Sequence, residues 1–370
     1  MPVTPRPIVL SHINNPRAPR HQRETTRFIA RWLASIRGLE YGGDFDPRLH
    51  AGHRCYLVPA QTLKGPEEAR ALNVHGPDDL FGGYVERDFM ASKIIAHPLV
   101  SPRAIHPEGW SEAFATRVHE CALPGFSVFS RDDAEVAVRQ LLPHGTVRVK
   151  AARASGGREQ WQISAMDELH AWFGEPNGDA MLEGGVVFEQ DLAECQTFSV
   201  GQLSIDGRLL SYFGTQHVTP DHAGELAYGG SDLVVVQGDY DALLTLDLAD
   251  PVRLAIAQAR CFDAAADALL PGFFASRRNY DTVQGLDLQG QMRAGILEQS
   301  WRIGGATSAE VAALQAFIDN PRLRAVRASS FERFEDKPLP ANATVIFRGK
   351  DAEVGFLLKY AMVEPYDGPK

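Results

Sequence analysis

Residues 277–305 constrain the fold of this chain more than any other stretch, because they predict two strands that end side by side. Residues 279–283 alternate polar and apolar side chains, as a half-buried strand does. After a turn-forming segment, residues 294–298 make a second short strand that ends in a carboxylate. If the two strands pair as a hairpin, Asp281 and Glu298 lie next to each other at the rim of a sheet.

Two more polar side chains extend this cluster. Ser300 and Arg302 follow Glu298 at alternate positions, so on an extended backbone they share its face. Two carboxylates, a hydroxyl and a guanidinium suit a divalent cation that bridges anionic oxygens, with an arginine to hold further negative charge. The alternative interpretation is a surface hairpin with ordinary charged residues at its rim.

The composition is that of a globular protein. The chain has 370 residues, of which 44% are hydrophobic and 23% charged, enough for two or three packed units. The formal net charge of -10 disfavours a nucleic-acid partner, because no basic field would attract a polyanion. A small anion such as ATP is compatible with this charge, since it needs only a local cluster of cations.

Cysteine spacing and hydropathy indicate the compartment. Cys55, Cys121, Cys195 and Cys261 form no C-x-x-C pair, which favours small buried side chains over a zinc site or a disulfide framework. The N-terminus does not resemble a signal peptide, and no segment reaches the apolar length of a membrane span. We therefore expect a soluble cytoplasmic protein with no membrane partner, and leave a homodimer open.

The beginning of the chain predicts a small α/β unit. Residues 8–10 and 55–58 are short apolar strands, and between them apolar residues from Phe28 to Ile36 recur at helical spacing.

A second informative stretch follows the strand predicted at residues 147–150. The strand ends in Lys150 and leads into a small-residue loop that contains Gly156 and Gly157. Backbone N–H groups in such a loop can surround phosphate oxygens, and Lys150 would add a point charge for the same phosphates. The stretch is not a Walker A loop, and the alternative is a plain turn.

The remaining predicted elements rest on local cap and turn signals. Ser111 is an N-cap, and Ser130 with Asp133 forms a capping box. The others are a strand at 186–192, a hairpin at 199–213 with an Asp206-Gly207 turn, a flexible loop at 228–232, a helix at 251–269, a helix opened by a capping box of Thr307 and Glu310, and two closing strands at 343–347 and 354–363.

In this order the elements resemble the ATP-grasp superfamily, whose members hold ATP between two α+β subdomains. The match covers about residues 93–305, and the preceding residues resemble the N-terminal domain of that fold. The whole chain also resembles an uncharacterised bacterial family of ATP-grasp-like proteins, sometimes labelled biotin carboxylase-like. The phrases that carry this resemblance are Tyr-Gly-Gly-Ser-Asp-Leu from Tyr228, Phe-Phe-Ala-Ser-Arg-Arg-Asn-Tyr-Asp from Phe273 and Leu-Glu-Gln-Ser-Trp-Arg-Ile-Gly-Gly from Leu297.

The resemblance implies an α+β fold in four parts. They are an N-terminal α/β domain at 1–92, a small ATP-grasp subdomain at 93–188, a large subdomain with the metal site at 189–330, and C-terminal strands at 331–370 that complete the fold.

The resemblance also implies an ATP site. Lys93 and Lys150 would contact phosphates, although Ser92 stands where an acidic neighbour is usual. Thr197 stands where a glutamate usually holds the ribose, which leaves the ribose contact open. The implied nucleotide-binding residues are Lys93, Lys150, Gly156, Gly157 and the backbone hinge of Glu189, Gln190 and Leu192.

A magnesium site and substrate contacts follow from the same resemblance. Asp281, Glu298 and Ser300 would hold Mg²⁺, with Ser300 in place of the usual asparagine and Trp301 in place of the usual proline. Arg302 and Lys150 would be catalytic, with Arg302 stabilising negative charge. The implied substrate contacts are Tyr228, Gly229, Gly230, Ser231, Arg277 and Arg278, the two arginines being solvated rim charges in the alternative interpretation.

The implied activity is that of an ATP- and Mg²⁺-dependent ligase, which activates a carboxylate as an acylphosphate for attack by an amine or thiol. A kinase on the same fold is one alternative. A nucleotide-binding protein without turnover is another, and the departures at Ser300 and Thr197 favour it. Retention of Lys150 together with Asp281, Glu298 and Arg302 argues against it. The substrates themselves cannot be identified from the sequence.

Overall fold

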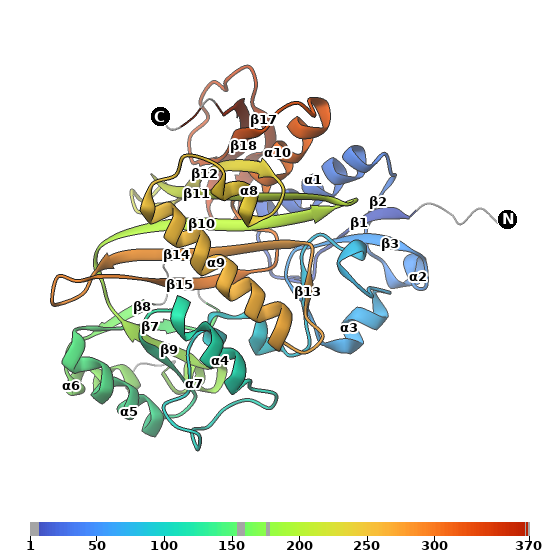
Figure 1. Ribbon diagram of the computed structural model, residues 1–370. Helices are drawn as coiled ribbons and strands as arrows, with labels where there is room; N and C mark the ends of the chain where they lie inside the picture. The colour runs from blue at the N-terminus through green and yellow to red at the C-terminus, as the bar shows by residue number, and fades with distance from the viewer. Residues whose placement is uncertain (1–6, 154–159, 175–177, 367, 369–370) are drawn as a thin grey trace.

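The computed structural model describes residues 7–153, 160–174, 178–366 and 368, and these residues fold as α+β, as the sequence predicts. Figure 1 shows a large sheet through the middle of the molecule, with a smaller sheet below it and an N-terminal unit beside it. Every helix in the described part of the chain is too short or too polar to serve as a transmembrane span.

The large sheet has eight strands in the order β15-β14-β10-β11-β12-β16-β18-β17. Neighbouring strands in it are antiparallel, so side chains alternate between two faces. Its strands are β10 (Ala193–Ile205), β11 (Arg208–Pro220), β12 (Leu226–Gln237), β14 (Arg277–Leu286), β15 (Met292–Ser300), β16 (Ala325–Arg333), β17 (Thr344–Asp351) and β18 (Gly355–Pro365).

Helices cover both faces of the large sheet. On one face, α8 (Tyr240–Leu244) and α9 (Asp250–Leu269) bury Phe198, Val200 and Tyr280 in the largest apolar cluster. On the other face, α10 (Thr307–Asp319) and α1 (Arg20–Arg37) bury Leu203 and its neighbours in a second cluster. Because adjacent residues of one strand enter different cores, a shift of register by one residue would expose both cores.

The N-terminal unit is the predicted α/β unit with one further strand. Its parallel sheet has the order β2-β1-β3, with α1 packed on it. A second small sheet has the order β13-β5-β4, and through β13 it joins this unit to the start of β14. The elements are β1 (Ile8–His12), β2 (Tyr41–Asp44), α2 (Pro47–His50), β3 (Cys55–Pro59), β4 (Leu63–Lys64), α3 (Gly65–Ala71), β5 (Gly83–Val85) and β13 (Phe274–Ala275).

The smaller sheet below has the order β6-β9-β7-β8 and its own apolar core. A 3-10 segment, Lys93–Ala96, and α4 (Glu112–Val118) precede it in the chain. The elements of this unit are β6 (Gly125–Val128), α5 (Arg131–Leu141), β7 (Val147–Ala151), β8 (Gln160–Ile163), α6 (Met166–Phe173), α7 (Gly178–Gly184) and β9 (Val186–Gln190). The predicted Gly156 and Gly157 loop lies outside the described residues.

Most of the predictions made from local signals are confirmed. The Ser111 and Ser130 side chains cap α4 and α5. Asp206 and Gly207 both have positive φ in the tight turn between β10 and β11, the backbone that an Asp-Gly pair favours. The two predicted closing strands are β17 and β18, at the edge of the large sheet.

The flexible loop predicted at residues 228–232 is wrong, because these residues lie inside β12. They pair with β11 on one side and β16 on the other, with a bulge at Gly229. Gly230 has a φ of +145°, and a Cβ there would collide with the Ser330 carbonyl oxygen. The glycine pair therefore allows close strand packing, which a local composition signal cannot distinguish from a mobile loop.

The capping box predicted at Thr307 and Glu310 is also wrong. Thr307 accepts a hydrogen bond from the Gly304 N–H (2.9 Å), and Glu310 turns into the protein interior instead of back to the helix end.

Candidate active site

The hairpin of β14 and β15 places the two predicted metal carboxylates side by side. Asp281 and Glu298 are direct partners in the antiparallel register, with a bulge next to them. Asp281 accepts hydrogen bonds from Ser199 (3.0 Å), Asn279 (3.1 Å) and Gln216 (3.2 Å). Burial, and then the neighbouring Glu298 carboxylate, raise the pKa of Asp281. A divalent cation would relieve this repulsion, so the pair suits oxygen-ligated Mg²⁺.

Glu298 also joins the large sheet to the segment before the smaller one. Its carboxylate lies 2.9 Å from the Lys93 Nζ, and Lys93 is only 6% exposed. The next residue, Gln299, donates to the Ser92 (2.8 Å) and Met90 (3.2 Å) carbonyl oxygens. The structure therefore brings the first predicted phosphate lysine to the predicted metal pair, across about two hundred residues of sequence.

The second predicted lysine belongs to a buried cluster at the smaller sheet. Lys150 on β7 pairs with one oxygen of Glu189 on β9, and His97 Nε2 lies 3.2 Å from the other oxygen. All three side chains are buried. Burial alone would raise the Glu189 pKa, but Lys150 and His97 outweigh it and lower that pKa to about 2. Glu189 is thus held as an anion between a lysine and a histidine.

Residues 93–97 connect these two clusters. Lys93 at the start of this segment pairs with Glu298, and His97 at its end contacts Glu189. The Ser127 hydroxyl donates to the Ile94 carbonyl oxygen, which ties the middle of the segment to the smaller sheet. The segment therefore lies between the two sheets, with Lys93 directed to one of them and His97 to the other.

His97 and Gln216 are contacts that our sequence reasoning missed. His97 precedes a proline in a linker, and Gln216 lies on an ordinary β-strand, so neither carries a local signal. Only the long-range pairing places them at Glu189 and Asp281.

The predicted hinge lies at the end of β9. The N–H groups of Gln190 and Asp191 donate to Pro124 (2.9 Å) and Thr146 (2.9 Å). The Leu192 carbonyl accepts from Cys195. These contacts fix the backbone of the hinge between β6 and β7, next to the Glu189 cluster. The role of the hinge in reading adenine stays a prediction.

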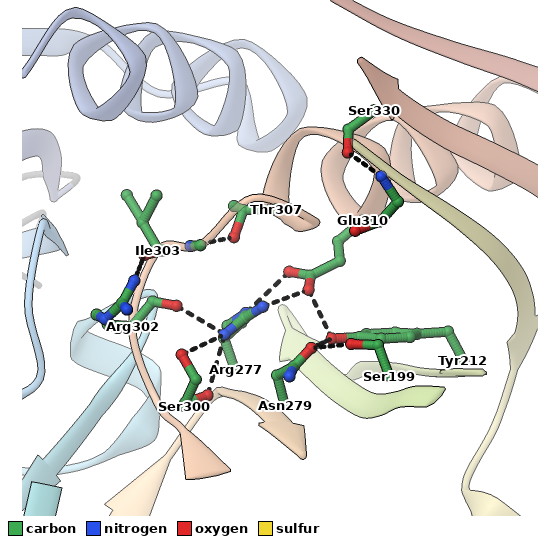
Figure 2. Close-up of polar contacts among 12 residues, drawn as sticks. Ser199, Tyr212, Arg277, Asn279, Ser300, Arg302, Ile303, Thr307, Glu310 and Ser330 are labelled. Atoms are coloured by element: carbon green, nitrogen blue, oxygen red, sulfur yellow. Dashed lines mark hydrogen bonds and ion pairs between the residues drawn. The ribbon is translucent and has the colours of Figure 1, made fainter. Parts of the chain in front are cut away.

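Arg302 follows β15 and lies next to a second arginine (Figure 2). Its Nη1 donates to the Ile303 carbonyl oxygen at 2.7 Å. Burial lowers the Arg302 pKa, Glu298 and Asp281 offset this in part, and Arg277 adds to it. A partly desolvated guanidinium with a cationic neighbour is a favourable place for an anion.

Arg277 and Arg278 are not the solvated rim charges of the alternative interpretation. Arg277 is 1% exposed and pairs with Glu310, which is fully buried (Figure 2). Arg278 pairs with Asp263 and Asp267 (both 2.8 Å) on the other side of β14. The Arg277 guanidinium is engaged inside the protein, and the Arg278 guanidinium is mostly buried between two carboxylates, so both already have anionic partners within the chain. Ser300, predicted as a metal ligand, has its Oγ 3.4 Å from the Arg277 Nη1.

Of the four predicted substrate residues of β12, Tyr228 contacts Gly305, three residues after Arg302 in the chain. The Tyr228 hydroxyl is 2.6 Å from the Ser231 Oγ, and the Tyr228 ring packs against Gly305. The Ser231 N–H donates to the Ser330 Oγ at 3.1 Å. The hydroxyl groups of Tyr228, Ser231 and Ser330 therefore form a neutral hydrogen-bonded group.

The side chains of the site suit a magnesium ion that takes some of its ligands from phosphate, rather than one bound entirely by protein side chains. No group of three or more His, Cys, Asp or Glu side chains suited to a metal occurs among the residues that the structure describes. Mg²⁺ is commonly held by one or two carboxylates plus phosphate oxygens and water, which is what Asp281 and Glu298 offer.

Comparison with models of known protein families identifies one family. A family model described as "Protein of unknown function (DUF3182)" matches residues 9–361. A search of curated proteins finds no match to this sequence.

Among solved structures, the ATP-grasp ligases expected from the resemblance are found. The phosphoribosylamine–glycine ligase of Thermotoga maritima is 13% identical, with a TM-score of 0.49 over 97% of this chain and 93% of that one. The ATP-grasp ligase PsnB, complexed with a minimal precursor, is 9% identical, with a TM-score of 0.38 over 80% and 91%. A RimK domain ATP-grasp protein of Sphaerobacter thermophilus is 11% identical, with a TM-score of 0.38 over 83% and 95%. These similarities concern the arrangement of the chain and assign no substrate.

Proposed function

This chain belongs to the DUF3182 family of proteins of unknown function, and we propose that it is an ATP- and Mg²⁺-dependent ligase that joins a carboxylate to an amine or thiol. The observation that carries the proposal is the convergence of Lys93, Glu298 and Asp281 at one place, with Arg302 two residues beyond β15. Lys150 and Glu189 lie at the other end of the same short connecting segment.

In this proposal, one group of residues binds the nucleotide and a second group binds the metal. Lys93 and Lys150 would hold the phosphates, and the hinge at the end of β9 would hold the adenine. Asp281 and Glu298 would hold Mg²⁺, which when bound neutralises charge on the phosphate oxygens. Lys93 now neutralises Glu298, so it would exchange this carboxylate for a phosphate when nucleotide and metal enter.

Arg302 would act on the acceptor. The substrate carboxylate attacks the γ-phosphorus, the bond from that phosphorus to the bridging oxygen breaks, and ADP leaves. The amine or thiol then attacks the acyl carbon and gives up a proton to solvent, the bond from the acyl carbon to the phosphate oxygen breaks, and phosphate leaves. Negative charge develops on the acyl oxygen in this second step. The Arg302 guanidinium is partly buried and donates to the Ile303 carbonyl oxygen, so it is suited to stabilise this charge.

A nucleotide-binding protein without turnover is the second candidate. The observation that favours it is the contact between the Ser300 Oγ and Arg277. This contact holds near Arg277 the hydroxyl that we predicted as a metal ligand. Its distinguishing feature would be tight nucleotide binding with no product from any acceptor.

The test is to trap the activated acyl group. The full chain is incubated with ATP, Mg²⁺, hydroxylamine and each member of a panel of carboxylates, and hydroxamate and phosphate are measured. A ligase gives hydroxamate in amounts equal to the phosphate released, because hydroxylamine intercepts the acylphosphate. Binding of a non-hydrolysable ATP analogue without hydroxamate from any carboxylate would leave the second candidate, and absence of nucleotide binding would refute both.

A further inference from the structure

Two consecutive arginines begin β14, and each forms an ion pair with a buried carboxylate from a different helix. Arg277 donates from Nη2 (2.6 Å) and Nε (2.9 Å) to Glu310 of α10. Arg278 donates from Nη1 to Asp263 of α9 at 2.8 Å. Neighbouring strand residues point to opposite faces, so the two ion pairs lie on opposite sides of the large sheet.

Arg277 also holds the backbone on both sides of Trp301. Its Nη1 donates to the Ser300 carbonyl (3.0 Å) and the Arg302 carbonyl (2.7 Å) (Figure 2). One planar guanidinium therefore binds Glu310 with two of its nitrogens and the turn after β15 with the third. A lysine ammonium lacks this fork, so it could keep the charge pair without making the same set of contacts.

Trp301 is anchored from the other side of the sheet. Its indole N–H donates to the Tyr280 hydroxyl (3.3 Å), and that hydroxyl donates to Asp263, the carboxylate that Arg278 binds. The Trp301 side chain is 1% exposed and packs on Phe273, with ring centroids 4.4 Å apart. The turn from Ser300 to Arg302 is thus held from both faces of the sheet.

The same Glu310 also reaches the metal carboxylate. The Tyr212 hydroxyl lies 2.6 Å from Glu310 and 2.8 Å from the Asn279 side-chain oxygen. The Asn279 amide donates to Asp281 at 3.1 Å. The buried Glu310 carboxylate on α10 is therefore connected to two parts of the candidate site. It reaches the turn of Arg302 through Arg277, and it reaches Asp281 through Tyr212 and Asn279.

We propose that Arg277 with Glu310, and Arg278 with Asp263, are positioning residues that hold the turn 300–302 so that Arg302 keeps a fixed place relative to Asp281 and Glu298. This inference rests on the proposed function for its effect on catalysis. It assigns a role to Ser300 and Trp301, two of the departures from the ATP-grasp pattern, because these are residues that the two ion pairs hold. It also replaces the predicted substrate contacts of Arg277 and Arg278.

The test uses Arg277→Lys, which keeps the charge opposite Glu310 and so avoids burying an unpaired carboxylate. The matched control is Arg37→Lys, since Arg37 is a mostly buried guanidinium that binds Asp206 with two nitrogens (2.7 and 2.9 Å) at the hairpin turn between β10 and β11. Trp301→Phe is the second variant, because it removes the indole N–H while keeping an aromatic ring against Phe273. Backbone hydrogen exchange, nucleotide affinity and hydroxamate rate are measured for each.

For Arg277→Lys we expect amide exchange in residues 298–305 to accelerate at least about 10-fold, while the rest of the large sheet keeps its protection. Nucleotide affinity should stay within about twofold, and the rate of hydroxamate formation should fall on the order of 100-fold, the usual cost of a small misplacement of a reacting group. Trp301→Phe should change the same quantities in the same direction by less, and Arg37→Lys should change none of them.

Two results would overturn the proposal. Unchanged exchange in residues 298–305 would show that Arg277 does not hold the turn, and exchange that rises equally throughout the sheet would show a merely structural ion pair. If the wild type forms no hydroxamate while Arg277→Lys still loosens only residues 298–305, the ligase assignment fails and the ordering of this turn by Arg277 stands.

Discussion

The buried Lys150–Glu189 pair predicts a large, pH-dependent loss of stability when the lysine is removed. Lys150→Met keeps the length and apolar stem of the side chain but leaves Glu189 in the protein interior with His97 as its remaining partner. Removing one partner of a buried ion pair commonly costs about 3–5 kcal/mol, because the other charge is left uncompensated.

The lowered pKa of Glu189 indicates a similar loss of free energy of unfolding. Its decrease from 4.5 to about 2 in the folded protein corresponds to about 3 kcal/mol of stabilisation. Because the folded pKa is lowered, this contribution is present above pH 4.5 and is lost as the pH falls from 4.5 toward 2. In Lys150→Met, burial raises the pKa of Glu189, so the variant gains stability relative to the wild type as the pH falls. The difference in free energy of unfolding between the wild type and Lys150→Met should therefore be largest near neutral pH and should decrease as the pH falls.

Urea unfolding followed by tryptophan fluorescence measures this difference, since Trp172 lies in the core of the smaller sheet and the partly buried Trp161 packs against that core. Arg148→Met is the matched control, because Arg148 lies on the same strand and pairs with Asp191 in a more exposed position (2.7 Å). That pair should contribute no more than about 1 kcal/mol. The double variant Lys150→Met/Glu189→Gln should recover most of the lost stability, since it removes both charges.

Our reasoning would be refuted if Lys150→Met cost no more than Arg148→Met, or if the double variant were no more stable than the single one. The double variant also separates folding from binding. If it folds as expected, any remaining loss of ATP-analogue affinity, on the order of 1–3 kcal/mol, reports the contact of Lys150 with phosphate.

Two further predictions concern the metal pair and the arginine. Glu298→Gln should abolish ATP turnover and weaken Mn²⁺-nucleotide binding with little change in melting temperature, because Glu298 is partly exposed; a variant that unfolds would show that its pairing with Lys93 is structural. Arg302→Ala should lower hydroxamate yield roughly 100-fold while calorimetric ATP affinity stays nearly unchanged, the usual scale for removing a donor to developing negative charge; equal yield in the variant would remove Arg302 from the mechanism.

Several features of this protein follow from short-range patterns in the sequence. The period of polar and apolar residues predicts the hairpin of β14 and β15, and its register then sets Asp281 opposite Glu298. The Asp206-Gly207 turn and the caps at Ser111 and Ser130 are predicted for the same reason. Each depends on the backbone preferences of a few consecutive residues, which act wherever those residues occur.

Other features depend on partners that are remote in sequence. Residues 228–232 have the composition of a loop, but pairing with β11 and β16 on both sides makes them part of a strand. Glu310 has the spacing of a capping residue, but burial against Arg277 is the stronger contact. A Gly-Gly pair or a Thr-x-x-Glu spacing cannot reveal these partners, because the gain from burying them appears only after distant segments have packed.

The charged residues of the candidate site show the same division. Lysine and glutamate types at strand ends could be identified from the sequence, but not that Lys93 faces Glu298 or that His97 faces Glu189. Arg277 and Arg278 are adjacent in the chain, yet strand geometry sends them to carboxylates on α10 and α9. The sequence around a charged residue does not show which residue will be its partner. The strength of an ion pair depends on the distance between its charges and on their burial, and the packing of the sheets and helices decides both.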